Sequence, residues 1–153
     1  MKKTIKITDL AGMIGEEQEP SSWMEITQDR VNAFADATGD HQFIHVDPEK
    51  AAKTLFRGTI AHGFLTLSVV PALLQENAPE IEGLAMGINY GTDHVRFVQA
   101  VKVGSRIRAL QKIREVTPKG PRRWFTRTEV TVEIEGQEKP ALVAEFLAML
   151  VVK

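Results

Sequence analysis

The stretch TIAHGFLTLSVVPALLQE, residues 59–76, decides the fold because it is apolar nearly all round. A helix without a polar face is normally buried inside a protein rather than laid on its surface. The stretch is too short, and too polar at its ends, to match the roughly 18 apolar residues of a membrane-spanning helix. Pro71 lies inside it and predicts a kink or a break. We therefore expect one long buried helix that other elements must cover.

The residues after this helix show the alternation of apolar and polar side chains that is typical of strands. Met86, Ile88 and Tyr90 alternate with other residues, and residues 124–134 repeat the alternation. The run ALVAEFLAMLVV, residues 141–152, predicts a strand buried on both faces. Turn signals fall at Gly91, Gly104, Pro118–Pro121 and Gly136. The order predicts an α+β fold, in which about four antiparallel strands wrap around the buried helix. A curved sheet with free edges predicts a homodimer that joins two sheets.

Two shorter helices are expected before the buried one. The apolar spacing over residues 31–38 is helical, Thr27 is a suitable N-cap, and Gly39 stands where a glycine ends a helix. Asp47, followed by proline, predicts the start of a second helix that would end at Gly58. Its apolar face would consist of Ala51, Ala52, Leu55 and Phe56.

The amino-acid composition limits the classes of function that the protein could have. The 153 residues fit a single domain over residues 1–153, with 43% hydrophobic residues, 25% charged residues and a net charge of −1. This balance indicates neither a nucleic-acid partner nor a membrane partner. The absence of cysteine excludes disulfides, thiolate metal ligands and a cysteine nucleophile. The N-terminus lacks the apolar run of a signal peptide, so we expect a cytoplasmic protein.

The charge is unevenly distributed along the chain. Residues 93–127 hold ten Lys/Arg and two Asp/Glu, a balance of +8. Such a stretch is usually a solvated strand face. The alternative is a patch that binds an anionic ligand, such as a phosphorylated cofactor.

The polar stretch TGDHQFIHVDP, residues 38–48, is the first candidate site. His41 and His45 have the i, i+4 spacing of a zinc-protease helix, but Gln42 stands where that motif needs a glutamate as general base. We therefore expect no metal. Ser68 or Thr66 could supply a hydroxyl nucleophile, but the sequence lacks the GxSxG motif that such a nucleophile usually needs. Two interpretations stay open: acid–base catalysis by an aspartate and a histidine, and a turn whose acidic side chains cap backbone amides.

Asp40 and His45 cannot face one another on a regular element. Five residues place them roughly 140° apart on a helix and on opposite faces of a strand. A loop could turn both into one cleft, as loops often do for catalytic residues. His62 and Gly63 then fall in the first turn of the buried helix, where free N–H groups can polarise a carbonyl. An acid, a histidine and a helix N-terminus together favour chemistry beside a carbonyl.

The assembled residues resemble a known family. FADATGDHQFIHVDPEKA, residues 34–51, followed by GTIAHGFLTLS, residues 58–68, resembles the MaoC-like hydratases and dehydratases, in particular the subgroup related to nodulation protein N. The stretch from Tyr90 to Phe97 is also similar. The resemblance implies the hot-dog fold, a curved antiparallel sheet around a central helix that dimerises into one continuous sheet.

The resemblance also implies an activity in fatty acid metabolism: (R)-specific, reversible hydration of a trans-2-enoyl-CoA by a lyase. Asp40 and His45 would match the family's catalytic pair, with Asp40 favoured as the base, and the Gly63 amide would match the oxyanion donor. No metal or redox cofactor would be needed, since coenzyme A, or an acyl carrier protein, comes with the substrate. Some members have a serine at the position of Pro71 that supports the aspartate, a role for Ser68 or Thr66 here. Substrate contacts are expected from Gln42, His62, Arg96, Arg122 and Arg123, the arginines binding the phosphates of coenzyme A.

Two other functions remain as alternatives. A hot-dog acyl-CoA thioesterase also uses a carboxylate and a helix N-terminus, but the spacing of Asp40 and His45 argues against it. A non-catalytic subunit that binds acyl thioesters could keep the fold without the chemistry. The set of Asp40, His45 and Gly63 makes an enzyme the favoured interpretation.

Overall fold

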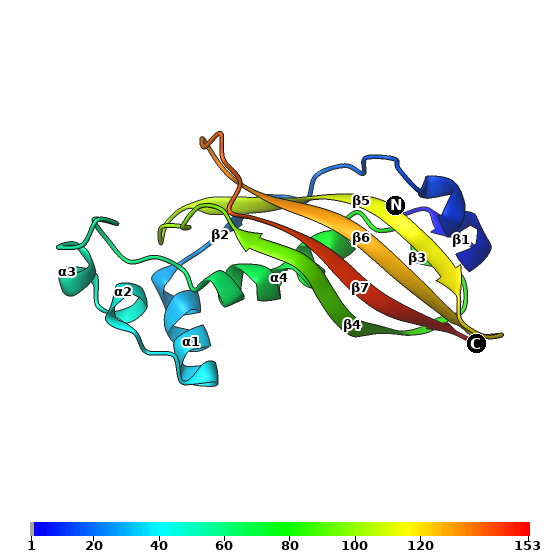
Figure 1. Cartoon of the computed structure of the whole chain (residues 1–153), viewed down its shortest axis with the longest axis horizontal. Helices are drawn as coiled ribbons and strands as arrows, with labels where there is room; N and C mark the ends of the chain where they lie inside the picture. The colour runs from blue at the N-terminus through cyan, green and yellow to red at the C-terminus, as the bar shows by residue number, and fades with distance from the viewer. Residues whose placement is uncertain (1) are drawn as a thin grey trace.

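A curved antiparallel sheet covers one central helix in the computed structural model, which describes residues 2–153 (Figure 1). The elements in chain order are β1 (Thr4–Ile5), the 3-10 helix η1 (Ile7–Met13), β2 (Met24–Glu25), α1 (Gln28–Thr38), α2 (Phe43–Val46), α3 (Pro48–Ala51), α4 (Gly63–Gln75), β3 (Glu80–Ile81), β4 (Leu84–Phe97), β5 (Arg106–Pro118), β6 (Arg123–Ile134) and β7 (Leu142–Val152). The main sheet has the order β2-β5-β6-β7-β4. Within residues 2–153, none of the helices has the length and apolar character needed to cross a membrane.

The core lies between α4 and the concave face of the sheet. Leu65, Val70 and Leu73 of α4 are buried there. The strands contribute Ile107, Ala109, Val130, Val132, Leu142 and Ala144 to the same cluster. These strand residues follow the alternation that the sequence predicts, because every second side chain points to the same face. The predicted sheet around a buried helix is confirmed.

The central helix differs from its prediction in two respects. It begins at Gly63 instead of near Thr59, because the preceding residues run beside the β4–β5 connection. There Ile60 bridges Lys102, and the Ala61 N–H donates to the Val101 carbonyl at 2.8 Å. The helix continues through Pro71 without a break. One side of α4 is uncovered, with Phe64 67% exposed.

The predicted caps of the short helices are confirmed. The Thr27 hydroxyl accepts the Arg30 N–H, and Gly39 ends α1 with a φ of 82°, a conformation that favours glycine. Asp47 caps α3 by accepting the Lys50 N–H. The expected length of this helix is wrong, because it ends at Ala51 and the turns that follow leave Leu55 86% exposed.

Two predictions about the strands are also wrong. Gly91 does not mark a turn but lies within β4, at a register shift against β7, and such a bulge suits a glycine. The strand β7 is not buried on both faces, because only its concave face packs against α4. Glu145 in its middle pairs instead with Arg127. The short strands β1 and β3 and the helix η1 were not predicted, since two-residue strands show no sequence period.

The strand β4 forms one edge of the main sheet and exposes apolar side chains along its length. Leu84, Met86, Ile88, Tyr90 and Phe97 are each at least 40% exposed. A long, open and apolar edge is a ready template for pairing with another strand.

Candidate active site

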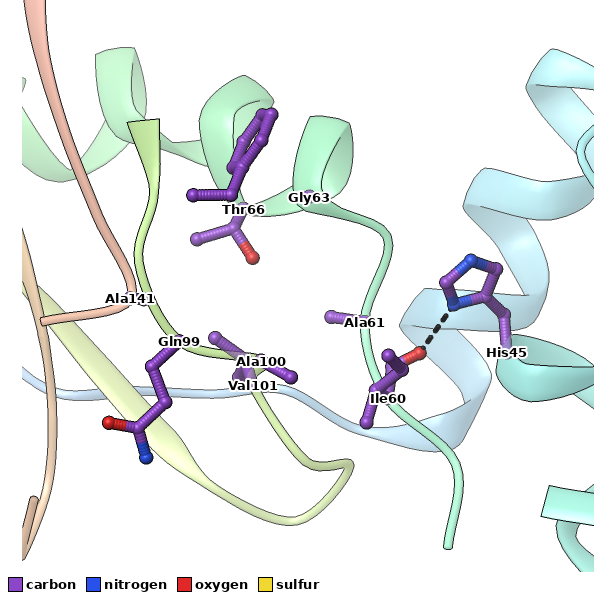
Figure 2. Close-up of a pocket in the computed structure, with 10 residues that line it drawn as sticks. His45, Ile60, Ala61, Gly63, Thr66, Gln99, Ala100, Val101 and Ala141 are labelled. Carbon is purple, nitrogen blue, oxygen red and sulfur yellow. Dashed lines mark hydrogen bonds between the residues drawn. The ribbon is translucent and has the colours of Figure 1, made fainter. Parts of the chain in front are cut away.

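The site lies at the N-terminal end of α4, where α1 and α2 approach it (Figure 1). His45 belongs to the four-residue helix α2 and is only 6% exposed. Its Nδ1 donates to the Ile60 carbonyl at 2.7 Å (Figure 2). Because a carbonyl can only accept, Nδ1 carries the proton, and Nε2 of the neutral ring has a free lone pair.

Asp40 reaches the same place from the turn between α1 and α2. It follows Gly39, and its Oδ1 accepts the Gln42 N–H at 3.3 Å. Nitrogen or oxygen atoms of Asp40, His45 and His62 lie within 4.8 Å of one another. The structure therefore brings the predicted pair together through an irregular segment, as the spacing in the sequence required.

The environment of His45 favours its neutral form. Burial lowers the pKa of His45, and the neighbouring His62 lowers it further, against the opposing effects of the Ile60 bond and the Asp40 charge. The ring is therefore a free base near neutral pH, with Nε2 able to accept a proton.

Gly63 is the first residue of α4, so its N–H is one of the helix amides without an intrahelical acceptor. Gly63 lines a pocket of about 260 Å³ together with His45, Ile60, Ala61, Thr66, Phe97, Gln99, Ala100, Val101 and Ala141 (Figure 2). A substrate carbonyl in this pocket would meet the positive end of the helix within the same cavity as His45. A second pocket, of about 400 Å³, lies at the other end of α4, near Gln75 and η1.

The geometry of the two histidines does not suit a shared metal ion. The rings of His45 and His62 are stacked, with centroids 3.8 Å apart and planes inclined by 23°. A metal lies close to the plane of each imidazole at about 2 Å from its nitrogen. Two nearly parallel planes at this separation do not meet that close to both rings.

Other predicted residues take supporting or separate positions. Gln42 is the exposed N-cap residue of α2. The His41 ring bonds Asp36 at 2.8 Å on the surface, and this bond raises the pKa of His41. The Ser68 hydroxyl donates to the Phe64 carbonyl, and Thr66 lines the pocket. Neither hydroxyl bonds Asp40 among the hydrogen bonds of residues 2–153.

The basic stretch is mostly a charged strand face. Arg108 pairs with Glu133 at 2.7 Å, and Arg127 lies between Asp93 and Glu145. Among the residues that the structure describes, the basic side chains of this stretch without a carboxylate partner are Arg96, Lys102, Lys119, Arg122 and Arg123. The sequence offered this solvated face as one of its two interpretations.

The five free cations fall into two groups. Arg96 and Lys102 are each next in sequence to a residue that lines the pocket, Phe97 and Val101 respectively. Lys119, Arg122 and Arg123 lie at the β5–β6 turn, which is at the opposite end of the sheet (Figure 1). The ten residues of β6 from Arg123 to Val132, which is next to pocket residue Ala141, span about 30 Å. Neither arginine therefore reaches the pocket of its own chain, and their role in binding stays a prediction.

The sequence did not point to the β4–β5 connection as part of the site. Phe97, Gln99 and Val101 line the pocket, and Ala141 reaches it from the β6–β7 connection. These residues carry no chemical motif, and only the closure of the sheet brings them beside Gly63. The alternation of apolar residues that ends at Phe97 was the one sequence feature that could have pointed to this part of the pocket.

We expect Gly63→Ala to lower kcat by roughly tenfold with little loss of stability. A Cβ atom at Gly63 would lie 3.0 Å from the ring of Phe97, which would have to move within the pocket wall. Small displacements of this kind disturb catalytic geometry more than folding. The matched control is Gly58→Ala, where a Cβ would meet nothing within 4 Å. Equal kcat values for the two variants would contradict the assignment of Gly63.

Comparison with known proteins identifies what this architecture resembles. Residues 9–138 match the family described as MaoC like domain. The chain is 46% identical over 147 residues to "Nodulation protein N" of Rhizobium leguminosarum bv. viciae, covering 95% of this chain and 91% of that protein. It is 47% identical over 151 residues to "3-hydroxyacyl-thioester dehydratase Z" of Mycobacterium tuberculosis (strain H37Rv), covering 99% of each.

The fold is shared with solved structures. The structure named as a monoamine oxidase regulatory protein from Archaeoglobus superposes with a TM-score of 0.82 at 24% identity, covering 100% of this chain and 99% of that one. The common architecture is the hot-dog fold, as the resemblance in the sequence implied.

Proposed function

Because the chain belongs to the MaoC-like dehydratase family, we propose that it hydrates trans-2-enoyl thioesters reversibly to (R)-3-hydroxyacyl thioesters. The chain is a dehydratase, and therefore a hydro-lyase. The observation that carries the proposed reaction is the position of a neutral His45, which lies beside Asp40 and shares a pocket with Gly63.

The thioester carbonyl would lie against the N-terminus of α4, with its oxygen near the Gly63 N–H. Conjugation makes C3 of the enoyl group electrophilic, and addition of water there generates an enolate oxygen. A donor already aimed at that oxygen stabilises the transition state more than the substrate.

The free Nε2 of His45 is suited to take the proton from the attacking water. Hydroxide adds to C3, and the imidazolium then returns a proton to C2 on the same face, so that atoms and charge balance. Asp40 would accept the second proton of the water in a hydrogen bond and hold its direction. This assignment differs from the expectation that Asp40 is the base, because the Ile60 bond leaves Nε2 of His45 unprotonated.

The test is the loss of enoyl absorbance when the protein is mixed with crotonyl-CoA and with longer enoyl-CoA esters. We expect absorbance to fall without release of free thiol, and the product to have the (R) configuration. Thiol release without hydration would support the thioesterase alternative. Absence of both signals, with binding retained, would support a non-catalytic subunit.

We propose that Arg96 and Lys102 bind the phosphates of the carrier, since each is next in sequence to a residue that lines the pocket. We expect Lys102→Gln to raise KM for an enoyl-CoA several-fold, and to leave KM for a truncated thioester without phosphates nearly unchanged. The Arg122→Gln/Arg123→Gln double variant is the comparison. A larger KM effect from that double variant would return the phosphate site to the β5–β6 turn and, given the distance, to a neighbouring subunit.

The open edge of β4 supports a homodimer in which two such edges pair. Phe97 at the end of this edge packs against Phe64 on the uncovered side of α4, and Phe64 is 67% exposed. We expect Ile88→Lys to shift the protein from dimer to monomer in light scattering. Leu55→Lys is the matched control, because Leu55 is more exposed but lies far from β4 in sequence and fold. A dimer that survives Ile88→Lys and a second variant, Tyr90→Lys, would contradict this interface.

A further inference from the structure

His62 is buried beside the catalytic pair but does not line the pocket. It is 3% exposed, and the residues around the pocket pass from Ala61 to Gly63 without it. It precedes the first residue of α4, yet its side chain makes no cap bond there. The sequence predicted that His62 contacts substrate, and its position behind the pocket wall suggests a different role.

Two neighbours of the His62 ring are the proposed catalytic residues. Its Nε2 donates to the backbone carbonyl of Asp40 at 3.0 Å, and its ring stacks on that of His45 at 3.8 Å between centroids. Phe34 of α1 packs against the ring from another direction, with centroids 4.9 Å apart. The ring is therefore held by α1, and in turn it contacts the Asp40 turn and α2.

The hydrogen bonds also define which nitrogen of His62 is the donor. A carbonyl can only accept, so Nε2 carries the proton. The Nδ1 atom is buried and has no partner in the part of the chain that the structure describes. The bond from Nε2 to the Asp40 carbonyl is therefore the hydrogen bond that orients the His62 ring.

We propose that His62 is a positioning residue that sets Asp40 and His45 relative to one another: its N–H fixes the backbone of Asp40 while its ring face fixes the plane of His45. As far as it concerns catalysis, this proposal rests on the hydratase function proposed above. One imidazole then couples two elements that are separate in the chain, the turn at Asp40 and the helix α2.

Two substitutions separate the two contacts. His62→Asn keeps an N–H donor but has no ring to stack, and His62→Phe keeps a ring but has no donor. Because misplacing reacting groups by a fraction of an ångström lowers rates steeply, we expect each to reduce kcat by roughly tenfold or more. KM should change less than threefold, since His62 lies outside the pocket. The control is His41→Asn, which removes an exposed histidine paired with Asp36.

NMR of ¹³C- and ¹⁵N-labelled histidine supplies a readout that a merely structural role would not change. The groups that act on the charge of His45 are His62 and Asp40. In His62→Asn the repulsion from His62 is gone, so the pKa of His45 should rise while burial still holds it down. The ring-current shift that His62 imposes on the His45 protons should also vanish, and it should persist in His62→Phe.

The outcomes separate this proposal from the proposed function. Altered His45 signals together with a loss of kcat at unchanged KM would support it. Wild-type kcat in both folded variants, or lower thermal stability with unchanged His45 signals and pH profile, would overturn it. If the protein hydrates no enoyl thioester, the NMR measurements still decide whether His62 sets His45. Should His62→Asn not fold, His62→Gln, which can also keep the bond to Asp40 and also lacks a ring, takes its place in the same comparison.

Discussion

Asp40→Asn is expected to fold like the wild-type protein and to lose at least about 10²-fold in kcat, the lower end for a positioned acid–base group. The substitution keeps the shape of the side chain, and the amide oxygen can still accept the Gln42 N–H that shapes the turn. It removes the negative charge and presents an NH₂ group, which cannot accept the hydrogen bond by which Asp40 would direct the attacking water. KM should change little, because Asp40 is not among the residues that line the pocket.

The same variant is expected to change the pH dependence of kcat/KM. Asp40 raises the pKa of His45, so its neutralisation should lower that pKa further. If His45 must be neutral to act, the acid limb of kcat/KM should move to lower pH, although the apparent values belong to the pair. Asp47→Asn is the matched control, because Asp47 caps α3 and asparagine caps almost as well. Near wild-type turnover in a folded Asp40→Asn variant would contradict the mechanism.

The chemistry of the site was more accessible from the sequence than its construction. Asp40, His45 and Gly63 were predicted as the site from the resemblance of their stretch to the family's motif, and the spacing of the first two showed only that a loop must bring them together. The apolar stretch that follows then placed a helix N-terminus beside them. The stack of His45 on His62 and the bond to Ile60 could not be predicted, since they depend on how residues 59–62 run beside the β4–β5 connection.

The strands show where local pattern is a sufficient guide and where it is not. Alternation at Val130 and Val132 identified the concave face correctly, because each side chain there packs against α4. The apolar run at residues 141–152 led to a wrong prediction of burial on both faces. The convex face of the sheet, to which β7 contributes Glu145, carries ion pairs that become apparent only from the register of β6 and β7. Arg127 and Glu145 are 18 residues apart in the chain. Their pairing neutralises charge that looked like a basic patch in the sequence.

His45→Ala is expected to reduce kcat by at least about 10²-fold as well, but this variant also disturbs the fold. Removing a side chain that is 6% exposed leaves a cavity and a carbonyl of Ile60 without its donor, at a cost of about 1–3 kcal/mol. His45→Gln is therefore the sharper variant. Its amide can donate to Ile60, but it has no nitrogen that accepts a proton near neutral pH.

The pH dependence distinguishes a catalytic His45 from a structural one. The pKa of His45 is lowered from 6.5, so wild-type kcat/KM should be constant above that value and fall only at lower pH, as the ring gains a proton. Stability has the same sign: the unfolded chain binds this proton first, so stability decreases as pH falls below about 6.5. In His45→Gln the acid limb of activity assigned to His45 should disappear together with at least about 10²-fold of turnover. An acid limb that persists unchanged in His45→Gln would assign the titration, and the proton transfer, to Asp40.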